Sequence, residues 1–358
     1  MTGELGRQYL KQYLQDTEQG YLSYLQQTAK EAYAIGEIPG KMVDYFIEIA
    51  KGGKRIRGGL IQLGYEIAGG TDIKSVQDAS LFAELFHAAV LIHDDVMDQD
   101  KLRRGVTSFH IKFAEIGKQL KIKDDPSHYG ESMAYGIGDT IFYLSWKKLM
   151  ESSFTDSVKV AVGKLYSECV VKVAYGQVMD ITNVSLSDVK ENDILTVLRY
   201  KTAEYTGMYP LLIGAAFGQM NDLVRRQALI EYGKAFGWAF QIQDDILGLY
   251  GDEEEFGKPV GSDLREGKNT LLMLNLLKMG TNDDRQFLKK TLGNKNATRE
   301  DVIQMRDRVK SSGAYRAVYD LGQKYVSDGI AQIPTITPEK KYQDILESLI
   351  TYMMERVV

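Results

Sequence analysis

The chain has 358 residues, of which 44% are hydrophobic, 26% are charged and 6 are proline, a composition that excludes low-complexity disorder and collagen-like chains. Its 44 basic and 49 acidic residues give a net charge of -5, which argues against a general nucleic-acid binder that relies on phosphate contacts. The single cysteine, Cys169, excludes a disulfide framework and a cysteine zinc cluster, and it indicates a reducing, cytoplasmic location.

We predict neither a signal peptide nor a membrane span. The N-terminus has no apolar core behind a basic start, as a secretory signal would have. The longest uncharged stretch, residues 205–221, contains three glycines and a proline and is shorter than the ~20 apolar residues that a membrane helix needs.

Apolar residues recur at helical spacing along most of the chain, most clearly in residues 80–98, 158–181 and 227–250. Val/Ile/Thr-rich runs with alternating polarity are nearly absent, and so are Asn-Gly or Asp-Gly turns between such runs. No stretch of turn residues is long enough to be an interdomain linker. We therefore predict an all-α protein of roughly a dozen or more helices that pack antiparallel as one bundle.

Three aspartates stand at the end of the first of these helices. Asp94 and Asp98 are one turn apart on the same helix face, with Asp95 beside them. The preceding residues, 88–92, are apolar, so the carboxylates lie where their mutual repulsion is poorly screened. A divalent cation would relieve this repulsion, and ligation by oxygen alone favours Mg²⁺ or Mn²⁺. Taken alone, the pattern is more often a solvated acidic helix end.

A second aspartate pair, Asp244 and Asp245, follows the apolar run 236–243. Two helices tipped with carboxylates could face each other across a cavity and hold metal ions between them, as in the metal sites of helix bundles. The recurrence makes coincidence the weaker explanation. The third acid is absent from the second motif, because Gly248 stands at the position that matches Asp98.

Basic residues gather in four clusters beside glycines or acids, at 52–59, 103–105, 200–202 and 257–268. Glycine lets the backbone approach an anion closely, and arginine grips phosphate oxygens with two parallel hydrogen bonds. Each cluster alone is more often a solvated surface, but together with the acids they indicate a diphosphate substrate. His87 stands two helical turns before Asp94 on the same face, although a single histidine there is more often a core residue.

In their order and spacing these motifs resemble those of the trans-isoprenyl diphosphate synthases, the polyprenyl synthetase family, from about Lys51 to Leu272. The matching motifs are GGKRIRG, HDDVMDQDKLRRG, GQVMD, KTAEYTG, FQIQDD and GKPVGSDLREGK. The resemblance implies a single domain over residues 1–358, an antiparallel helical bundle around a deep central cavity (the isoprenoid synthase fold), and a homodimer. The segment of residues 115–132 is longer and more charged than expected between these helices, and we interpret it as a surface insertion of unknown role.

The family's functional residues are carried over motif by motif. The resemblance implies three Mg²⁺ ions, which Mn²⁺ can replace, bound by Asp94, Asp98 and Asp244 and supported through water by Asp95 and Asp245. The residues that match direct contacts to the allylic diphosphate are Arg103, Lys201 and Lys258, and Lys268 matches a further cation nearby. Those that match the metal-free pocket for isopentenyl diphosphate are Lys54, Arg57, His87 and Arg104. Those that match the lining of the reaction centre are Thr202, Tyr205, Phe240 and Gln241, and those that match a pair beside the allylic tail are Gln177 and Asp180.

The implied reaction ionises an allylic C–O bond, after which the double bond of isopentenyl diphosphate attacks the carbocation and the product loses a proton. Metal ions and cationic side chains stabilise the departing diphosphate, and the two pockets set the approach of the two substrates. No side chain in the motifs is an obvious strong base, so the released diphosphate is the expected proton acceptor.

Two positions depart from the family pattern. Gly248 removes an outer carboxylate but leaves Asp244, so we expect activity to survive. Gly58 replaces a proline that is common in bacterial members, and it leaves Lys54 and Arg57 unchanged.

The resemblance places the growing product beside the helix that carries the first acidic motif. Ala89 and Val90, five and four residues before Asp94, lack the aromatic plug typical of many farnesyl synthases, so we expect growth beyond C15. Phe86 lies one helical turn deeper, where its ring would stop the growing product, although a phenylalanine there is more often ordinary core. Tyr143 is expected to form the floor of the product tunnel from the opposite wall. One helical turn adds ~5.4 Å of depth to the tunnel, which is close to the length of one isoprene unit. We therefore predict C20, geranylgeranyl diphosphate, ahead of C25–C50 products and then C15.

Three other interpretations remain open. A class I terpene cyclase shares the fold and a first acidic motif, but its second motif would be of the NSE or DTE type rather than FQIQDD. A catalytically silent regulatory subunit of a prenyl synthase would usually lack the acids of the first motif or the arginines of the RRG cluster, and this chain keeps both. A purely structural helix bundle leaves the ordered motifs unexplained.

Overall fold

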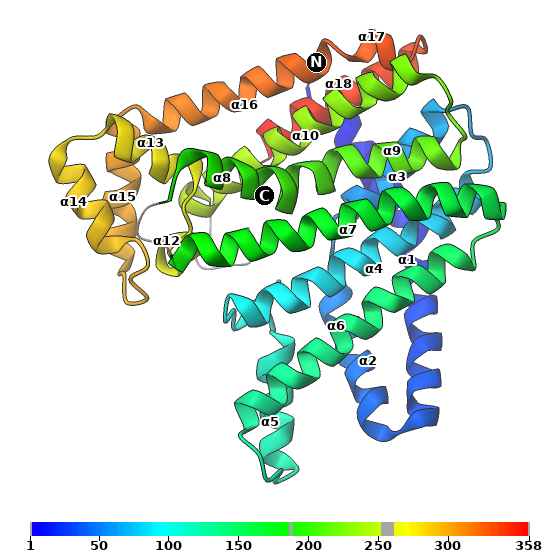
Figure 1. The fold of residues 1–358 in the computed structure, drawn as a ribbon, viewed down its shortest axis with the longest axis horizontal. Coiled ribbons are helices and arrows are strands. Elements are labelled where there is room, and N and C mark those ends of the chain that lie inside the picture. Colours follow the sequence, from blue (N-terminus) through cyan, green and yellow to red (C-terminus); the bar gives the residue numbers. More distant parts are fainter. Residues whose placement is uncertain (1, 186–188, 252–260, 357–358) are drawn as a thin grey trace. The chain divides into compact units, whose positions relative to one another are not determined.

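Helices make up nearly all of the computed structural model, which describes residues 2–185, 189–251 and 261–356 (Figure 1). Among these residues the only strands are β1 (Leu102–Arg103) and β2 (Val106–Thr107), an antiparallel hairpin in which Arg103 pairs with Val106. Its two-residue turn, Arg104 and Gly105, has positive φ angles of 54° and 76°. The all-α prediction is confirmed.

The chain divides into two compact units. The N-unit consists of Leu10–Gln62 and Gly70–Lys159, and the C-unit consists of Met1–Tyr9, Leu63–Gly69 and Val160–Val358. The helices with residues in both units are α1 (Glu4–Ile35), α3 (Ile56–Ile67) and α7 (Asp156–Ser185). The organisation of residues 1–358 as one domain stays a prediction.

Each unit has its own set of helices. The other helices of the N-unit are α2 (Glu37–Ala50), α4 (Ile73–Met97), α5 (Phe109–Gln119) and α6 (Pro126–Met150). Those of the C-unit are α8 (Glu191–Val197), the π-helix η1 (Leu198–Met208), α9 (Tyr209–Phe217), α10 (Leu223–Tyr250), α12 (Ser262–Glu266), α13 (Leu271–Met279), α14 (Asn282–Thr291), α15 (Arg299–Ser311), α16 (Ala314–Ile330), α17 (Ile333–Ile336) and α18 (Lys340–Glu355). Side chains cap several helix starts: Asp72 accepts a hydrogen bond from the Ser75 N–H before α4, and Asp222 caps α10 in the same way.

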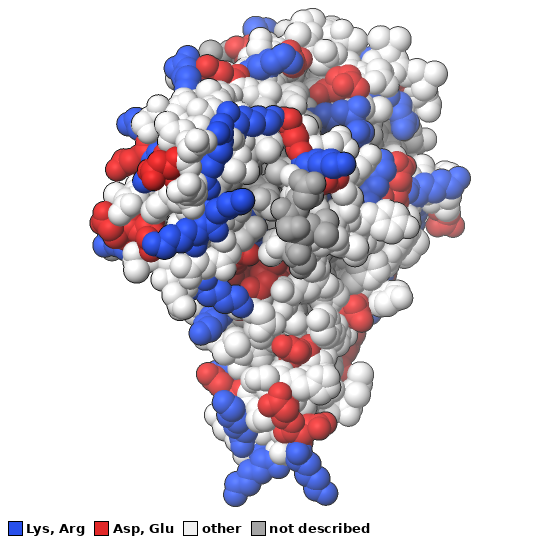
Figure 2. Space-filling model, turned by 60° about the vertical axis from the view of Figure 1, so that its left-hand side comes forward, with Lys and Arg blue, Asp and Glu red and all other residues white. Residues whose placement is uncertain are grey.

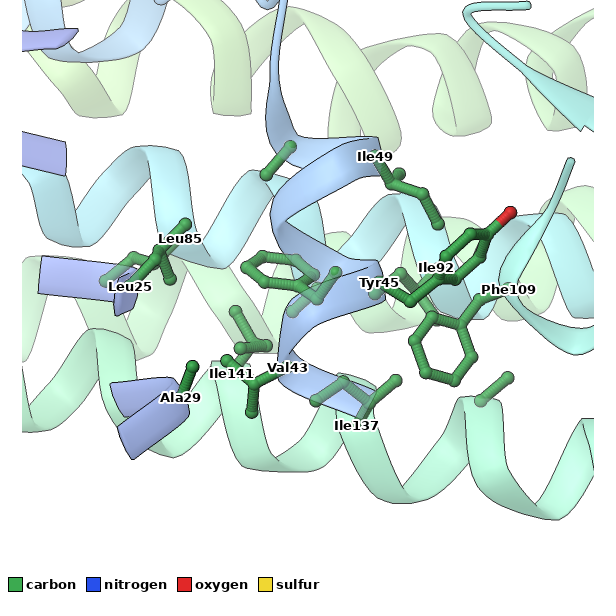
Figure 3. Packing of buried hydrophobic residues seen from close by; sticks show 14 of the residues in the cluster. Leu25, Ala29, Val43, Tyr45, Ile49, Leu85, Ile92, Phe109, Ile137 and Ile141 are labelled. Atoms are coloured by element: carbon green, nitrogen blue, oxygen red, sulfur yellow. The ribbon is translucent and has the colours of Figure 1, made fainter. Parts of the chain in front are cut away.

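The core of the N-unit is a cluster of apolar side chains from α1, α2, α4, α5 and α6 (Figure 3). Phe46 and Leu85 are fully buried in it, and the rings of Phe109 and Phe113 stack with their centroids 4.5 Å apart. Burial of each such side chain contributes roughly 1.5–3 kcal/mol. This packing fixes α4, which carries the first acidic motif, against α6.

Helix α4 is long and apolar enough to cross a membrane by length and composition, and it is the one such helix in the described part of the chain. However, 61% of its most apolar 18-residue window is buried inside the protein. The structure therefore gives α4 the role of a core helix.

The predicted surface insertion, residues 115–132, forms the end of α5, a short turn and the start of α6. The two helices pack along each other as a hairpin whose inner face buries Phe113. Figure 2 shows basic side chains projecting at the tip of this hairpin, where Lys118, Lys121 and Lys123 are exposed. The segment is thus helical, and its charge is concentrated at the turn.

Helix α10 is the centre of the C-unit and packs against η1, α9, α16, α17 and α18. η1 comes especially close because Gly207, Gly233 and Gly237 have no Cβ, and a Cβ on Gly237 would overlap the carbonyl oxygen of Ala203. This contact brings the KTAEYTG motif of η1 next to the FQIQDD motif of α10.

The substitution Gly237→Ala should lower the free energy of unfolding by about 1–3 kcal/mol, because the added methyl group has to displace the backbone of η1. Gly20→Ala on α1 is the matched control, since a Cβ there would lie 4.0 Å from its nearest neighbour, Leu81 Cδ1. The higher helix propensity of alanine should leave stability at position 20 unchanged or raise it by about 0.5–1 kcal/mol. Urea unfolding followed by circular dichroism measures both variants, and equal effects would contradict the close approach of η1.

Candidate active site

The first acidic motif lies at the C-terminal end of α4, where Asp98 is the C-cap. Asp95 is only 1% exposed, whereas Asp94 and Asp98 are half-buried. Arg103 on β1 donates hydrogen bonds to Asp95 and, at 3.2 Å, to Asp100, and its Nη2 atom lies 3.9 Å from Asp94 Oδ2. The β1–β2 hairpin therefore folds a guanidinium group back onto the acids.

Arg103 stays fully charged in this position. Burial lowers the pKa of Arg103, but the charges of Asp95, Asp94 and Asp100 outweigh this effect and raise the pKa above its ordinary value. The resemblance assigns Arg103 to the allylic diphosphate. In the structure it also neutralises part of the negative charge of the first motif.

Cationic side chains of the N-unit come together around His87. Burial lowers the pKa of His87 well below its ordinary value, and Arg57, Arg104 and Arg103 lower it further, so the imidazole is neutral. The loop before α3 reaches the hairpin turn here, because a Cβ on Gly53 would lie 3.3 Å from the Arg104 guanidinium. The structure thus brings together three of the four residues predicted for the isopentenyl diphosphate pocket.

Lys54, the fourth of these residues, is exposed on the same loop. The next residue, Arg55, is buried in a left-handed conformation with a φ of 47°. Its guanidinium pairs with Glu18 at 2.7 Å and stacks 3.8 Å from the centre of the Tyr21 ring. Arg55 therefore anchors the loop to α1, a role that sequence reasoning missed because spacing does not separate an anchored cation from a solvated one.

The structure explains why glycine stands at position 58. The Gly58 N–H donates a 2.8 Å hydrogen bond to Glu84 Oε1, which proline could not do. A Cβ on Gly58 would overlap the Tyr13 hydroxyl group, which is hydrogen-bonded to Ser80. This departure from the family pattern is therefore a packing requirement of the N-unit.

In the C-unit the GQVMD motif of α7 lies against the KTAEYTG motif of η1. Gly176 permits this approach, since a Cβ there would lie 2.6 Å from the Lys201 backbone nitrogen. The Lys201 ammonium group donates a 2.6 Å hydrogen bond to Asp180, so these two predicted residues form an ion pair. The other predicted residues in these motifs are the half-buried Gln177 and Thr202 and the buried Tyr205. A π-helix such as η1 is rare and occurs frequently at functional sites.

The second acidic motif, on α10, has a different environment. Asp244 is half-buried, whereas Asp245 is 5% exposed and accepts a 2.8 Å hydrogen bond from Gln241 at Oδ1. Within the described residues, Asp245 Oδ2 has no hydrogen-bond partner. Burial raises the pKa of Asp245 to about 8, and the negative charges of Asp263 and Asp244 contribute to this shift.

Arg356, the C-cap of α18, is a site residue that sequence reasoning missed. Its guanidinium is buried and lies 4.1 Å from the centre of the Phe240 ring. It donates hydrogen bonds to Asp244 Oδ1 at 3.0 Å and to the Phe240 carbonyl at 2.9 Å. Arg356 therefore pairs with the acid that is expected to bind metal, although no motif marks it in the sequence.

The structure describes only part of the last basic cluster, residues 257–268. Lys258 lies outside the described residues. Lys268 is half-buried and pairs with Glu266 at 2.9 Å. Together with Asp245 and Gly248, Lys268 lines a cavity of about 10 Å³ at the end of α10.

The residues expected to limit product length lie on α4 and α6. Phe86 and Ala89 are buried, and the ring of Phe86 contacts that of Phe142 edge to face, with centroids 5.8 Å apart. Tyr143, the expected floor, is 70% exposed. Neighbouring residues of an α-helix point about 100° apart, so α6 presents Phe142 rather than Tyr143 to Phe86. The aromatic partner of Phe86 on α6 is therefore Phe142. A role of Tyr143 in limiting product length stays a prediction.

The acids fit Mg²⁺, although no group of three or more His, Cys, Asp or Glu side chains is arranged as a metal site in the part of the chain that the structure describes. Mg²⁺ usually takes one or two protein carboxylates and completes its shell with water and substrate phosphates. The half-buried carboxylates of Asp94, Asp98 and Asp244 are donors of this kind. The unpartnered Oδ2 atom of buried Asp245 also suits a nearby hydrated cation.

Comparison with known proteins gives a consistent result. The polyprenyl synthetase family model matches residues 38–309. The geranylgeranyl diphosphate synthase of Saccharolobus solfataricus is 32% identical over 85% of this chain and 87% of its own length. The short chain isoprenyl diphosphate synthase of Methanocaldococcus jannaschii is 37% identical over 74% of each chain. The crystal structure of geranylgeranyl pyrophosphate synthase from Corynebacterium glutamicum, complexed with isoprenyl diphosphate and magnesium, has a TM-score of 0.87 at 27% identity and covers 99% of this chain and 98% of its own.

Gly58→Ala should lower the free energy of unfolding by about 1–3 kcal/mol, because its methyl group overlaps the Tyr13 hydroxyl. Adding Tyr13→Phe removes the overlapping oxygen and should recover part of this loss. Urea unfolding of the two single variants and the double variant measures the coupling between the two positions. Strictly additive losses would show that the hydroxyl is not what excludes a side chain at position 58.

Proposed function

This chain belongs to the polyprenyl synthetase family and is a chain-elongating trans-prenyltransferase, and we propose that it condenses isopentenyl diphosphate with an allylic diphosphate to give geranylgeranyl diphosphate. The observation that carries the proposal is the N-unit site, where the acids of the first motif, Arg103 and the cations around neutral His87 lie together. The acids suit a metal-bound diphosphate, and the cations suit a second diphosphate without metal.

The first requirement of this reaction is a stabilised leaving group. When bound, Mg²⁺ supplies Lewis-acid stabilisation of the negative charge that develops on the allylic diphosphate. The residues that would hold the metal are Asp94, Asp98 and Asp244, supported by Asp95 and Asp245. The residues that we propose to bind the same diphosphate are Arg103, Lys201, Lys258 and Lys268. Charges fixed by the fold need no reorganisation when the C–O bond breaks.

The second requirement is an oriented acceptor. We propose that Lys54, Arg57 and Arg104 bind isopentenyl diphosphate. A neutral imidazole can donate one N–H hydrogen bond to a phosphate oxygen, so His87 would orient the same diphosphate. The proposed lining of the reaction centre consists of Thr202, Tyr205, Phe240 and Gln241, with Gln177 and Asp180 beside the allylic tail. The released diphosphate would accept the final proton.

Divalent metal use is supported by the Corynebacterium glutamicum structure, which contains magnesium and isoprenyl diphosphate. We propose three Mg²⁺ ions per active site, replaceable by Mn²⁺. We propose a cytoplasmic location, because a chain with a single cysteine suits a reducing compartment.

We also propose a homodimer that forms through α7. The outer face of this helix carries Val171, Tyr175 and Val178 at positions i, i+4 and i+7, and the last two are 67% and 61% exposed. A contiguous apolar stripe on a surface helix is typical of a protein contact. In a two-fold symmetric dimer the same stripe of both copies would be covered.

Val178→Lys should convert the dimer into monomers, because it places a charge within this apolar stripe. Light scattering coupled to size-exclusion chromatography gives the mass of the particle in solution. The control is Leu223→Lys, which changes an exposed apolar residue at the start of α10 and should leave the dimer intact. A Val178→Lys protein that remains dimeric would move the interface elsewhere.

The proposed function is tested with the purified chain, Mg²⁺, isopentenyl diphosphate and each allylic diphosphate in turn, with products identified by mass spectrometry. Linear C20 diphosphate is the expected product. A cyclic hydrocarbon would indicate a terpene cyclase. The absence of any product from the wild-type chain would favour a regulatory subunit.

Asp94→Ala should lower turnover by at least about 10²-fold with the fold retained, because stabilisation of the leaving group is the principal catalytic effect. Single-turnover assays give the rate, and circular dichroism confirms the fold. Asp124→Ala, in the exposed turn between α5 and α6, is a matched loss of one carboxylate and should leave the rate unchanged. A folded Asp94→Ala protein with wild-type activity would exclude the proposed metal site.

The product length should follow the residues on α4 and α6. Ala89→Phe should shorten the product toward C15, and Phe86→Ala or Phe142→Ala should lengthen it beyond C20. Tyr143→Ala is the control and should leave the C20 product unchanged, because this side chain is exposed. Replacing a buried phenylalanine by alanine costs about 3–5 kcal/mol, so unfolding curves must accompany the product analysis. If Tyr143→Ala alone alters the product, Phe142 is not the obstruction.

A further inference from the structure

Glu204, in the KTAEYTG motif of η1, is charged and buried but has no part in the proposed reaction. It is 1% exposed and belongs to the motif that also supplies Lys201 and Thr202. A buried carboxylate is costly unless it is paired and hydrogen-bonded. The partners of Glu204 therefore indicate what this acid does.

Two cations pair with the Glu204 carboxylate, one at each oxygen. Arg199 Nε donates a 2.6 Å hydrogen bond to Oε1, and Lys172 Nζ on α7 donates a 3.5 Å hydrogen bond to Oε2. The hydrogen bond to Glu204 raises the pKa of Arg199 above its ordinary value, so the guanidinium stays charged. Lys172 also pairs at 3.0 Å with Glu168, which lies one turn earlier on α7. Glu204 thus connects two parts of η1 with each other and with α7.

The spacing of Arg199 and Glu204 fits a π-helix and not an α-helix. The backbone hydrogen bonds of a π-helix join residues five positions apart, so the side chains of such residues are neighbours. In an α-helix the same residues point about 140° apart, and neighbouring side chains are three or four positions apart. A π-helix is mostly a single-turn feature, whereas η1 has 11 residues. The ion pair therefore stabilises this uncommon form relative to the α-helical one.

The helical form of η1 decides where Lys201 lies. A π turn holds about one residue more than an α turn, so a change to the α form would rotate Lys201 by about 100° relative to the residues after Glu204. Those later residues are fixed, because Gly207 lies against the backbone of α10. Lys201 would then lose its 2.6 Å hydrogen bond to Asp180 on α7.

We propose that Glu204 is a positioning residue for the allylic diphosphate. Its ion pairs with Arg199 and Lys172 hold η1 in the π form. This form in turn holds Lys201 where the diphosphate binds and Thr202 at the reaction centre. The proposal rests on the proposed function, and it adds to the motif a residue that acts through Lys201 without touching the substrate.

The test removes the charge of Glu204 and keeps the shape of the side chain, in Glu204→Gln. Hydrogen–deuterium exchange of residues 198–208 should become at least about tenfold faster, as the loss of a hydrogen bond between charged groups predicts. The apparent KM for the allylic diphosphate should rise about tenfold, because a small misplacement of a binding group can cost that much. The KM for isopentenyl diphosphate should stay within about twofold of the wild-type value, because its proposed cations lie on other elements.

Variants of Arg199 give a second answer if Glu204→Gln fails to fold. The Arg199 side chain is 46% exposed, so Arg199→Met removes the partner of Glu204 without leaving a gap in the core. Arg199→Lys keeps a cation five positions from Glu204 and should recover most of the wild-type KM. The matched control is Arg316→Met on α16, which breaks an exposed 2.8 Å pair with Asp320 at i, i+4 and should change neither measurement.

The outcomes separate this inference from the proposed function. Unchanged exchange of residues 198–208 in both Glu204→Gln and Arg199→Met would overturn the inference, whatever the activity of the wild-type chain. Equal rises in the two KM values would also overturn it, because they would indicate a general loss of structure. A wild-type chain that makes no prenyl product would instead overturn the proposed function, and the exchange data would still show whether Glu204 holds η1 in the π form.

Discussion

The ion pair between Asp95 and Arg103 is the interaction on which the site of the N-unit depends. Asp95 is almost fully buried, and a carboxylate left unpaired there would cost about 3–5 kcal/mol. The pair can form because the β1–β2 hairpin reverses the chain within two residues, Arg104 and Gly105, which both have positive φ angles. The same reversal brings Arg104 close enough to His87 to lower its pKa. One buried ion pair thus connects the acids of the first motif to the cations around His87.

The carboxylates of the second motif also need polar partners, and the partner of Asp244 comes from the end of the chain. Asp244 pairs with Arg356, and Gln241 donates to only one of the two oxygens of Asp245. Arg356 follows the last helix, so the site in the C-unit is complete only when α18 has packed against α10. The packing of the C-terminal helix and the position of the Asp244 carboxylate are therefore coupled through one guanidinium group.

The helices and the acidic motifs could be predicted from the sequence because their signals are local, in the 3.6-residue period of apolar residues and in the spacing of the aspartates. The residues that sequence reasoning missed make contacts across long distances in the chain, as Arg356 does with Asp244, 112 positions earlier. The contact of Phe86 with Phe142 rather than with Tyr143 could not be predicted, for a different reason. Both are aromatic residues in one apolar stretch, and only the rotation of α6 about its axis decides which one meets Phe86. The division into two units left no trace in the sequence, since no linker separates them.

Both departures from the family pattern are glycines that leave space for a group from another helix. Gly58 leaves space for the hydroxyl of Tyr13, and Gly248 leaves space for the carboxylate of Asp263. A comparison of motifs counts each glycine as a loss, although in the folded chain its missing side chain makes room for a polar group that is distant in the sequence.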